Sequence, residues 1–187
     1  MLELALVLGF IIGFLRGGSL RRLARLDIPY FYLIIAALLV QLSINILMRL
    51  WMAPVLAYFL LLSSYLLLLA AVWLNRQDEF LFLVLIGLIL NFLVIALNGG
   101  MPVSFQAAKM LGVDSGRYIG ELAQDFKHVP LLAGTKLKIL GDIIPLPRPF
   151  PLPQIFSAGD IFISMGVFLF LQNFMYYSGK HRRHPSI

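Results

Sequence analysis

The sequence contains no cysteine and few charged residues for its length. Of 187 residues, 13% are Asp, Glu, Lys or Arg. The lack of cysteine excludes a disulfide framework, thiolate catalysis and a cysteine-ligated metal cluster. The low charge excludes an ordinary soluble domain, in which about 25% of residues are charged. Apolar residues dominate instead: 60% of the chain is hydrophobic, and its mean hydropathy is +0.91.

Five apolar runs predict five membrane-spanning helices, at about residues 2–15, 28–50, 53–74, 79–97 and 159–177. A bilayer core of about 30 Å needs roughly 20 apolar residues in a helix. The first run is shorter, and it ends at Arg16 rather than at a cleavage site, so we expect it to be retained as a helix. The predicted fold class is an all-α membrane protein with one transmembrane domain.

Residues 98–157 form the one large loop between these runs, and two short amphipathic helices are predicted in it, at about 106–111 and 119–126. Further along, five prolines alternate with other residues from Pro145 to Pro153. This spacing favours an extended, polyproline-like strand. A loop so rich in Leu, Ile, Phe and Pro is expected to cover the outer mouth of the bundle as a lid, or to dock on a partner.

The basic residues predict the orientation in the membrane. The short loop near residue 50 carries only Arg49, whereas the other short segments carry eight basic residues: Arg16, Arg21, Arg22, Arg25, Arg76, Lys180, Arg182 and Arg183. The positive-inside rule places these eight in the cytoplasm, with the N-terminus and the large loop outside. Because the basic residues form no patch, we expect the anionic lipid of the bilayer, and not nucleic acid, as their partner.

Uncharged polar residues gather in the outer half of the predicted bundle. Gln41 and Asn45 are four residues apart and share a helix face, and Asn91 and Asn98, seven apart, share another. An amide in hydrocarbon is expected to bond either another helix or a bound molecule. Both alternatives remain open here. With two carboxyl groups from the outer side, the candidate ligand pocket consists of Gln41, Asn45, Asn91, Asn98, Asp142 and Asp160.

Glycines mark a smooth stripe on the first helix. Gly9, Gly13 and Gly17 recur every four residues. Such a stripe lets another helix backbone approach closely. The partner helix is expected either within the same bundle or in a second copy or another membrane subunit.

Two helix ends have recognisable signals. Ser157 and Asp160 match a capping box in which Asp replaces Glu or Gln, at the start of the last helix. Gly99 follows Asn98 and is expected to end the fourth helix in a left-handed conformation.

Motifs for catalysis, metals, nucleotides or other cofactors are not evident. His128 lies three residues after Asp125, a spacing that could orient an imidazole as a base, but a solvated surface histidine is the favoured interpretation. No span carries a charged residue at its centre, which argues against a proton relay. We therefore expect no catalytic residue, no metal and no cofactor.

Three segments of the outer loop resemble a bacterial integral-membrane family of unknown function. They are Asn98-Gly99-Gly100-Met101-Pro102-Val103, Leu140-Gly141-Asp142-Ile143-Ile144-Pro145 and Phe156-Ser157-Ala158-Gly159-Asp160. The resemblance implies a small multi-pass protein of the bacterial plasma membrane, and it implies no activity.

Three functions fit these features. The first is a non-catalytic subunit or docking module of a larger membrane assembly, including a homo-oligomer. The second is binding or transport of a quinone-like or isoprenoid-like lipid in the outward-facing pocket. The third is a membrane-embedded enzyme that modifies a lipid, with Asp142, Asp160 or His128 as acid or base.

Overall fold

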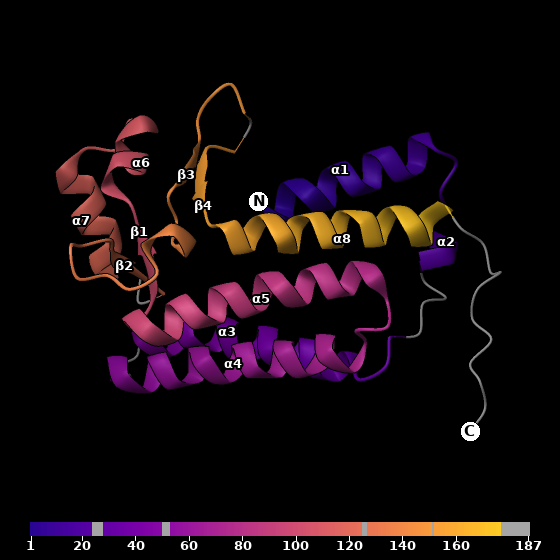
Figure 1. Ribbon diagram of the computed structural model, residues 1–187, viewed down its shortest axis with the longest axis horizontal. Coiled ribbons are helices and arrows are strands. Elements are labelled where there is room, and N and C mark those ends of the chain that lie inside the picture. Colours follow the sequence, from indigo (N-terminus) through magenta and orange to yellow (C-terminus); the bar gives the residue numbers. More distant parts are fainter. Residues whose placement is uncertain (24–27, 50–52, 125–126, 151, 177–187) are drawn as a thin grey trace.

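The computed structural model describes residues 1–23, 28–49, 53–124, 127–150 and 152–176. The longest helices in these ranges are α1 (Leu2–Leu15), α3 (Phe31–Arg49), α4 (Pro54–Leu74), α5 (Glu79–Asn98) and α8 (Ala158–Tyr176). They pack in the spatial order α1, α8, α5, α4, α3. The helix that comes last in the chain therefore lies between the first helix and α5 (Figure 1).

Among the described residues, three helices are long and apolar enough to cross a membrane, namely α4, α5 and α8. Helix α1 and the apolar part of α3, Phe31–Ile44, are shorter. This composition indicates a membrane protein. The apolar run predicted from residue 28 begins its helix only at Phe31, because Tyr30 has a φ of 60°, which a right-handed helix does not accept.

Glycines bring α5 and α8 together at backbone distance. A Cβ added to Gly87 would overlap the carbonyl oxygen of Gly159, and one added to Gly159 would overlap the Asn91 side chain. Further along α8, a Cβ at Gly166 would lie 2.7 Å from the Phe80 carbonyl oxygen. The closest small-residue contact of the bundle is therefore this one, rather than the stripe on the first helix.

The glycine stripe on α1 packs against another helix of the same chain. A Cβ at Gly9 would lie 2.9 Å from Leu171, and one at Gly13 would lie 2.6 Å from the sulfur of Met175, so both face α8. Gly17 is not part of this contact: no atom of the described residues lies within 4 Å of its added Cβ, and its φ of +76° places it in the turn after the helix.

A cap built from the large loop sits at one end of the bundle (Figure 1). It contains the helices α6 (Phe105–Met110) and α7 (Ser115–Gln124), the 3-10 turn η1 (Lys138–Leu140) and four short strands, and the short helix α2 (Leu20–Leu23) lies at the opposite end. Strand β1 (Met101–Val103) pairs in parallel with β2 (His128–Pro130), and a bridge joins Val103 to Asp142. Strand β3 (Ile144–Leu146) pairs antiparallel with β4 (Gln154–Phe156).

The proline-rich segment is a hairpin rather than one extended strand. After β3 the chain turns, with a hydrogen bond of 3.3 Å from the Phe150 nitrogen to the Pro147 oxygen, and returns as β4. Ile144 pairs with Phe156, and Leu146 pairs with Gln154. Proline spacing alone favours an extended chain, but pairing with a second strand supplies backbone hydrogen bonds that an isolated extended strand lacks.

Both helix-end signals are confirmed. The Asp160 nitrogen donates to Ser157 Oγ at 3.1 Å, and the Ser157 nitrogen donates back to Asp160 Oδ2 at 3.0 Å, which is a reciprocal capping box. Gly99 ends α5 with a φ of 82°.

The close contact between α5 and α8 predicts that adding one methyl group at Gly159 destabilises the protein. Gly159→Ala should lower the free energy of unfolding by about 1–3 kcal/mol, because neither the Asn91 side chain nor the Gly87 backbone can move away cheaply. Thermal unfolding in detergent measures the effect. The control is Gly120→Ala in α7, where nothing lies within 4 Å of the added Cβ and stability should stay equal or rise. Equal melting temperatures for Gly159→Ala and the wild type would contradict the tight contact.

Candidate ligand pocket

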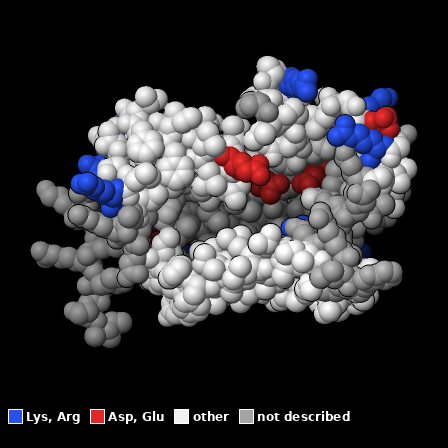
Figure 2. All heavy atoms as spheres, turned by 180° about the vertical axis from the view of Figure 1, so that it is seen from behind, with Lys and Arg blue, Asp and Glu red and all other residues white. Residues whose placement is uncertain are grey.

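A cavity of about 120 Å³ lies where the cap meets the bundle. Helices α3, α4, α5 and α8 and the cap contribute its lining, which consists of Gln41, Leu61, Tyr65, Asn91, Ile95, Met101, Lys127, His128, Asp142 and Asp160. The space-filling view shows acidic side chains along a hollow between the layer of α1 and α8 and the layer of α3 and α4 (Figure 2). The lining thus combines apolar helix faces with several groups that can carry charge.

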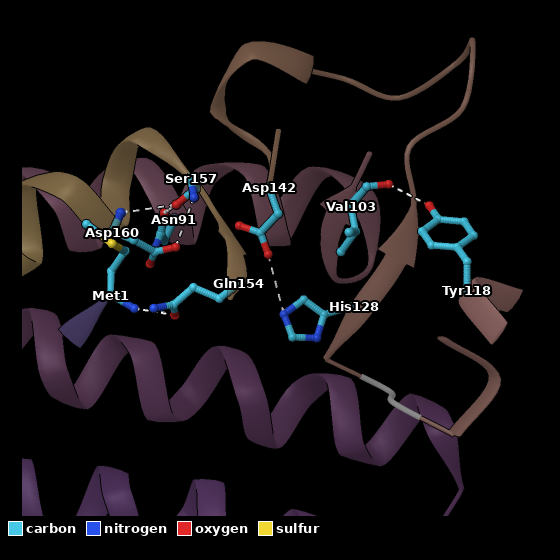
Figure 3. Close-up of polar contacts among 9 residues, drawn as sticks. All are labelled: Met1, Asn91, Val103, Tyr118, His128, Asp142, Gln154, Ser157 and Asp160. Atoms are coloured by element: carbon cyan, nitrogen blue, oxygen red, sulfur yellow. Dashed lines mark hydrogen bonds and ion pairs between the residues drawn. The ribbon is translucent and has the colours of Figure 1, made fainter. Parts of the chain in front are cut away.

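One wall of the cavity is a closed hydrogen-bond network between α5 and α8. Asn91, which is 2% exposed, donates from Nδ2 to Asp160 Oδ1 at 2.9 Å. Its Oδ1 accepts a hydrogen bond of 2.9 Å from the buried Ser157 hydroxyl (Figure 3). Because Asp160 Oδ2 accepts from the Ser157 nitrogen, both oxygens of this carboxylate have partners. Asn91 and Asp160 therefore hold two helices together as well as lining the cavity.

Gln41 lines the facing side of the cavity from α3. Its Nε2 donates to Ser64 Oγ at 3.1 Å, and the Ser64 hydroxyl donates to the Leu61 carbonyl oxygen at 2.7 Å. The amide nitrogen is thus used to join α3 to α4.

Asp142 differs from these residues because its backbone, and not its side chain, holds it in place. Its nitrogen donates to the Pro102 oxygen at 2.8 Å, and its oxygen accepts from the Ser104 nitrogen at 2.9 Å, so it extends the strand pairing beside β1. The residue is 6% exposed. One carboxylate oxygen, Oδ2, lies 3.6 Å from His128 Nε2 (Figure 3). The other, Oδ1, is buried and has no hydrogen-bond partner in the part of the chain that the structure describes.

The surroundings of Asp142 change its acidity. The pKa of its carboxyl group is raised to about 7, chiefly by burial and then by the nearby charge of Asp160, while His128 acts in the opposite direction. The amino group of Met1, which donates to Gln154 Oε1, also acts to lower this pKa. Asp142 is therefore poised to gain or lose a proton near neutral pH.

Four of the six residues expected in the pocket line this cavity: Gln41, Asn91, Asp142 and Asp160. Asn98 lies elsewhere, because its side chain bonds the backbone of Lys136 at both ends: Nδ2 donates to the Lys136 oxygen at 3.0 Å, and Oδ1 accepts from the Lys136 nitrogen at 2.8 Å. It ties the cap to the end of α5. The side chain of Asn45 falls outside the described residues.

Sequence reasoning missed Tyr65 and Ser157 and gave His128 a different neighbour. Tyr65 is the one tyrosine among the cavity-lining residues, and only its position one residue after Ser64 marks it in the sequence. Ser157 was predicted only to cap α8. The suggested partner of His128, Asp125, lies outside the described residues, and the structure places Asp142 beside this histidine instead.

Comparison with known proteins gives a family but no activity. The family model for the family of unknown function DUF5317 matches residues 25–172. This range contains every residue that lines the cavity. No curated protein and no solved structure matches the chain.

The raised pKa of Asp142 predicts a pH dependence of stability. The folded protein holds this proton more tightly than the unfolded chain, whose Asp titrates near about pH 4. Between about pH 4 and the pKa of about 7, Asp142 therefore contributes less and less stability as the pH rises. Asp142→Asn removes this contribution, so its melting temperature relative to the wild type should increase from about pH 5 to about pH 8.

Thermal unfolding in detergent across this pH range measures the difference. The same pair of measurements in a His128→Gln background separates the titration of the histidine from that of the carboxyl group. A difference between wild type and Asp142→Asn that does not change with pH would contradict the buried, raised carboxyl group.

Proposed function

We propose that this chain, which belongs to the DUF5317 family of unknown function, is a membrane protein that binds an amphipathic lipid, with the head group beneath the cap and the chain between the helices. The observation that carries the proposal is a second cavity, lined by the same four helices nearer the end opposite the cap, whose lining is apolar apart from Asn75. Its volume is about 240 Å³, and its lining consists of Ile28, Ile34, Ala71, Val72, Asn75, Leu81, Val167, Phe170 and Leu171.

The two cavities are lined by the same four helices, α3, α4, α5 and α8. On α8 the lining moves from Asp160 to Val167, and on α3 it moves from Gln41 to Ile34. Seven helical residues rise about 10 Å. The nearest lining residues of the polar and the apolar cavity are thus about two helical turns apart on α3 and α8, and the apolar cavity extends from there to Asn75 at the end of α4.

The packing order of the helices supports a binding crevice at this place. Helix α3 packs on α4, while α8 packs on α5 and α1. The space between α3 and α8 is therefore bordered by helices that have their main contacts elsewhere. A polar group at one end and apolar walls at the other match the two parts of a lipid molecule.

A docking role in a larger assembly is the second candidate. Large apolar side chains of the cap are exposed, with Ile139 76%, Met110 67% and Ile119 65% accessible. Surface of this kind supports contact with a partner subunit or with the bilayer surface. An acid–base role of Asp142 in lipid modification remains a prediction that rests on its pairing with His128.

If a lipid chain occupies the apolar cavity, filling this cavity with a large side chain should reduce the amount of lipid that the protein retains. Val167→Trp should fill the apolar cavity and lower the amount of tightly bound lipid at least about fivefold, because the indole takes the place of the lipid chain. Mass spectrometry of the gently solubilised protein measures the retained lipid. The control is Met165→Trp on the same helix, at a residue that is 42% exposed and does not line the crevice. Equal lipid retention by the wild type and Val167→Trp would overturn the proposal.

We propose further that the chain lies in a bacterial plasma membrane with the cap outside. The end of the bundle opposite the cap carries Arg16, Arg22 and Arg76, which supports a cytoplasmic location for that end.

Single cysteines test this orientation in a chain that has none of its own. In intact cells, a membrane-impermeant maleimide should label Ala133→Cys in the cap and leave Gln77→Cys, at the opposite end between α4 and α5, unlabelled. Both positions are exposed, so accessibility to the reagent differs only by the side of the membrane. The reverse labelling pattern would overturn the orientation.

A further inference from the structure

We infer that the polar cavity selects lipids whose head group carries a primary ammonium, because a carboxylate in its lining has a buried oxygen without a hydrogen-bond partner among the described residues. This inference rests on the lipid-binding function proposed above and adds the class of head group.

Several polar atoms of the cavity wall are already bonded within the protein. The Asn91 amide has a partner at each end, and both oxygens of Asp160 accept hydrogen bonds. The Gln41 Nε2 donates a hydrogen bond to Ser64 Oγ. These groups give the cavity its shape, and they leave little capacity to recognise a ligand.

Asp142 Oδ1 differs from these atoms. The residue is 6% exposed, it lines the cavity, and none of the described residues gives this oxygen a hydrogen bond. A buried polar atom without a partner costs free energy, more so when the group is ionised. A ligand that donates a hydrogen bond to this oxygen removes that cost, whereas a ligand with acceptors only increases it.

Charge favours an ammonium over a neutral donor. Two carboxylates, Asp142 and Asp160, line the cavity together and repel each other. The groups of opposite sign near Asp142 are His128 from β2 and the amino group of Met1, and Lys127 lines the same cavity. An ammonium beside Oδ1 relieves the repulsion between the carboxylates and supplies three N–H donors. A phosphate placed there would instead face two negative groups.

The proton on Asp142 should control this selection. Its pKa is raised to about 7 by burial, so above neutral pH the group is a carboxylate that accepts from an ammonium. Below neutral pH it is a neutral acid with weaker attraction for a cation. Selection should therefore strengthen as the pH rises through about 7.

The test measures competition among defined lipids. Purified full-length protein in detergent receives equal amounts of phosphatidylethanolamine, phosphatidylcholine and phosphatidylglycerol with identical chains, and native mass spectrometry reads the bound species. At about pH 8 the primary ammonium lipid should be retained at least about tenfold over the other two, the effect of one charge-assisted hydrogen bond. The trimethylated head group carries the charge without N–H donors, and the glycerol head group carries hydroxyl donors without positive charge.

Variants and pH link the preference to Asp142. Asp142→Asn keeps the size of the side chain and should abolish the preference, whereas Asp114→Asn removes a carboxylate from the exposed part of the cap and should preserve it. If Asp142→Asn fails to fold, the wild type alone still tests the inference, because its preference should fall severalfold from about pH 8 to about pH 5.5.

The outcomes separate the two proposals. Lipid binding that Val167→Trp abolishes, but without preference for the ammonium or with preference for phosphatidylglycerol, overturns the head-group inference and leaves the lipid-binding function standing. Absence of retained lipid in the wild type overturns both. Soluble phosphoethanolamine serves as a competitor, and displacement as strong as that by the lipid would assign the site to a free amine and overturn the lipid as its source.

Discussion

The contact between α5 and α8 is the constraint on which the rest of the structure depends. Gly87 and Gly159 let the two backbones touch, and the Asn91 side chain fills the space beside them. At this point Ser157 and Asp160 both cap α8 and bond Asn91. The same few atoms thus begin a helix, fix its distance from α5 and close one wall of the cavity. Without this contact α8 would have no defined depth relative to α5.

The position of α8 in turn determines the position of the cap. Strand β4 leads directly into the capping box, and it pairs with β3, which begins two residues after Asp142. On its other side Asp142 is bridged to β1, the continuation of α5. The carboxylate therefore enters the cavity because two helices fix the strands on either side of it. Its burial is imposed by the backbone pairing of the cap, and its raised pKa is the consequence.

Sequence reasoning found those features that depend on neighbouring residues. Apolar runs indicated the helices, the Ser157–Asp160 spacing indicated a capping box, and Gly99 indicated a helix end, because hydropathy and capping are local properties. Features that depend on distant partners were missed or misread. The proline-rich segment forms a hairpin because residues 154–156 pair with it. Asn98 does not line the cavity, because its side chain is hydrogen-bonded to the backbone nitrogen and oxygen of Lys136.

In the candidate site, too, the sequence predicts local features but not the contacts between residues that are distant in the chain. Depth along the helices could place Gln41 and Asn91 at one level, but only the fold shows that their amide nitrogens donate to side chains of other helices. In a bundle with few polar groups, most of them hold helices together, since an unpaired amide is costly in an apolar environment. The group available for recognition is then the one whose bonding the protein leaves incomplete. Among the described residues, Asp142 is such a group: it comes from the loop rather than from a span, it lines the polar cavity, and its buried Oδ1 has no hydrogen-bond partner.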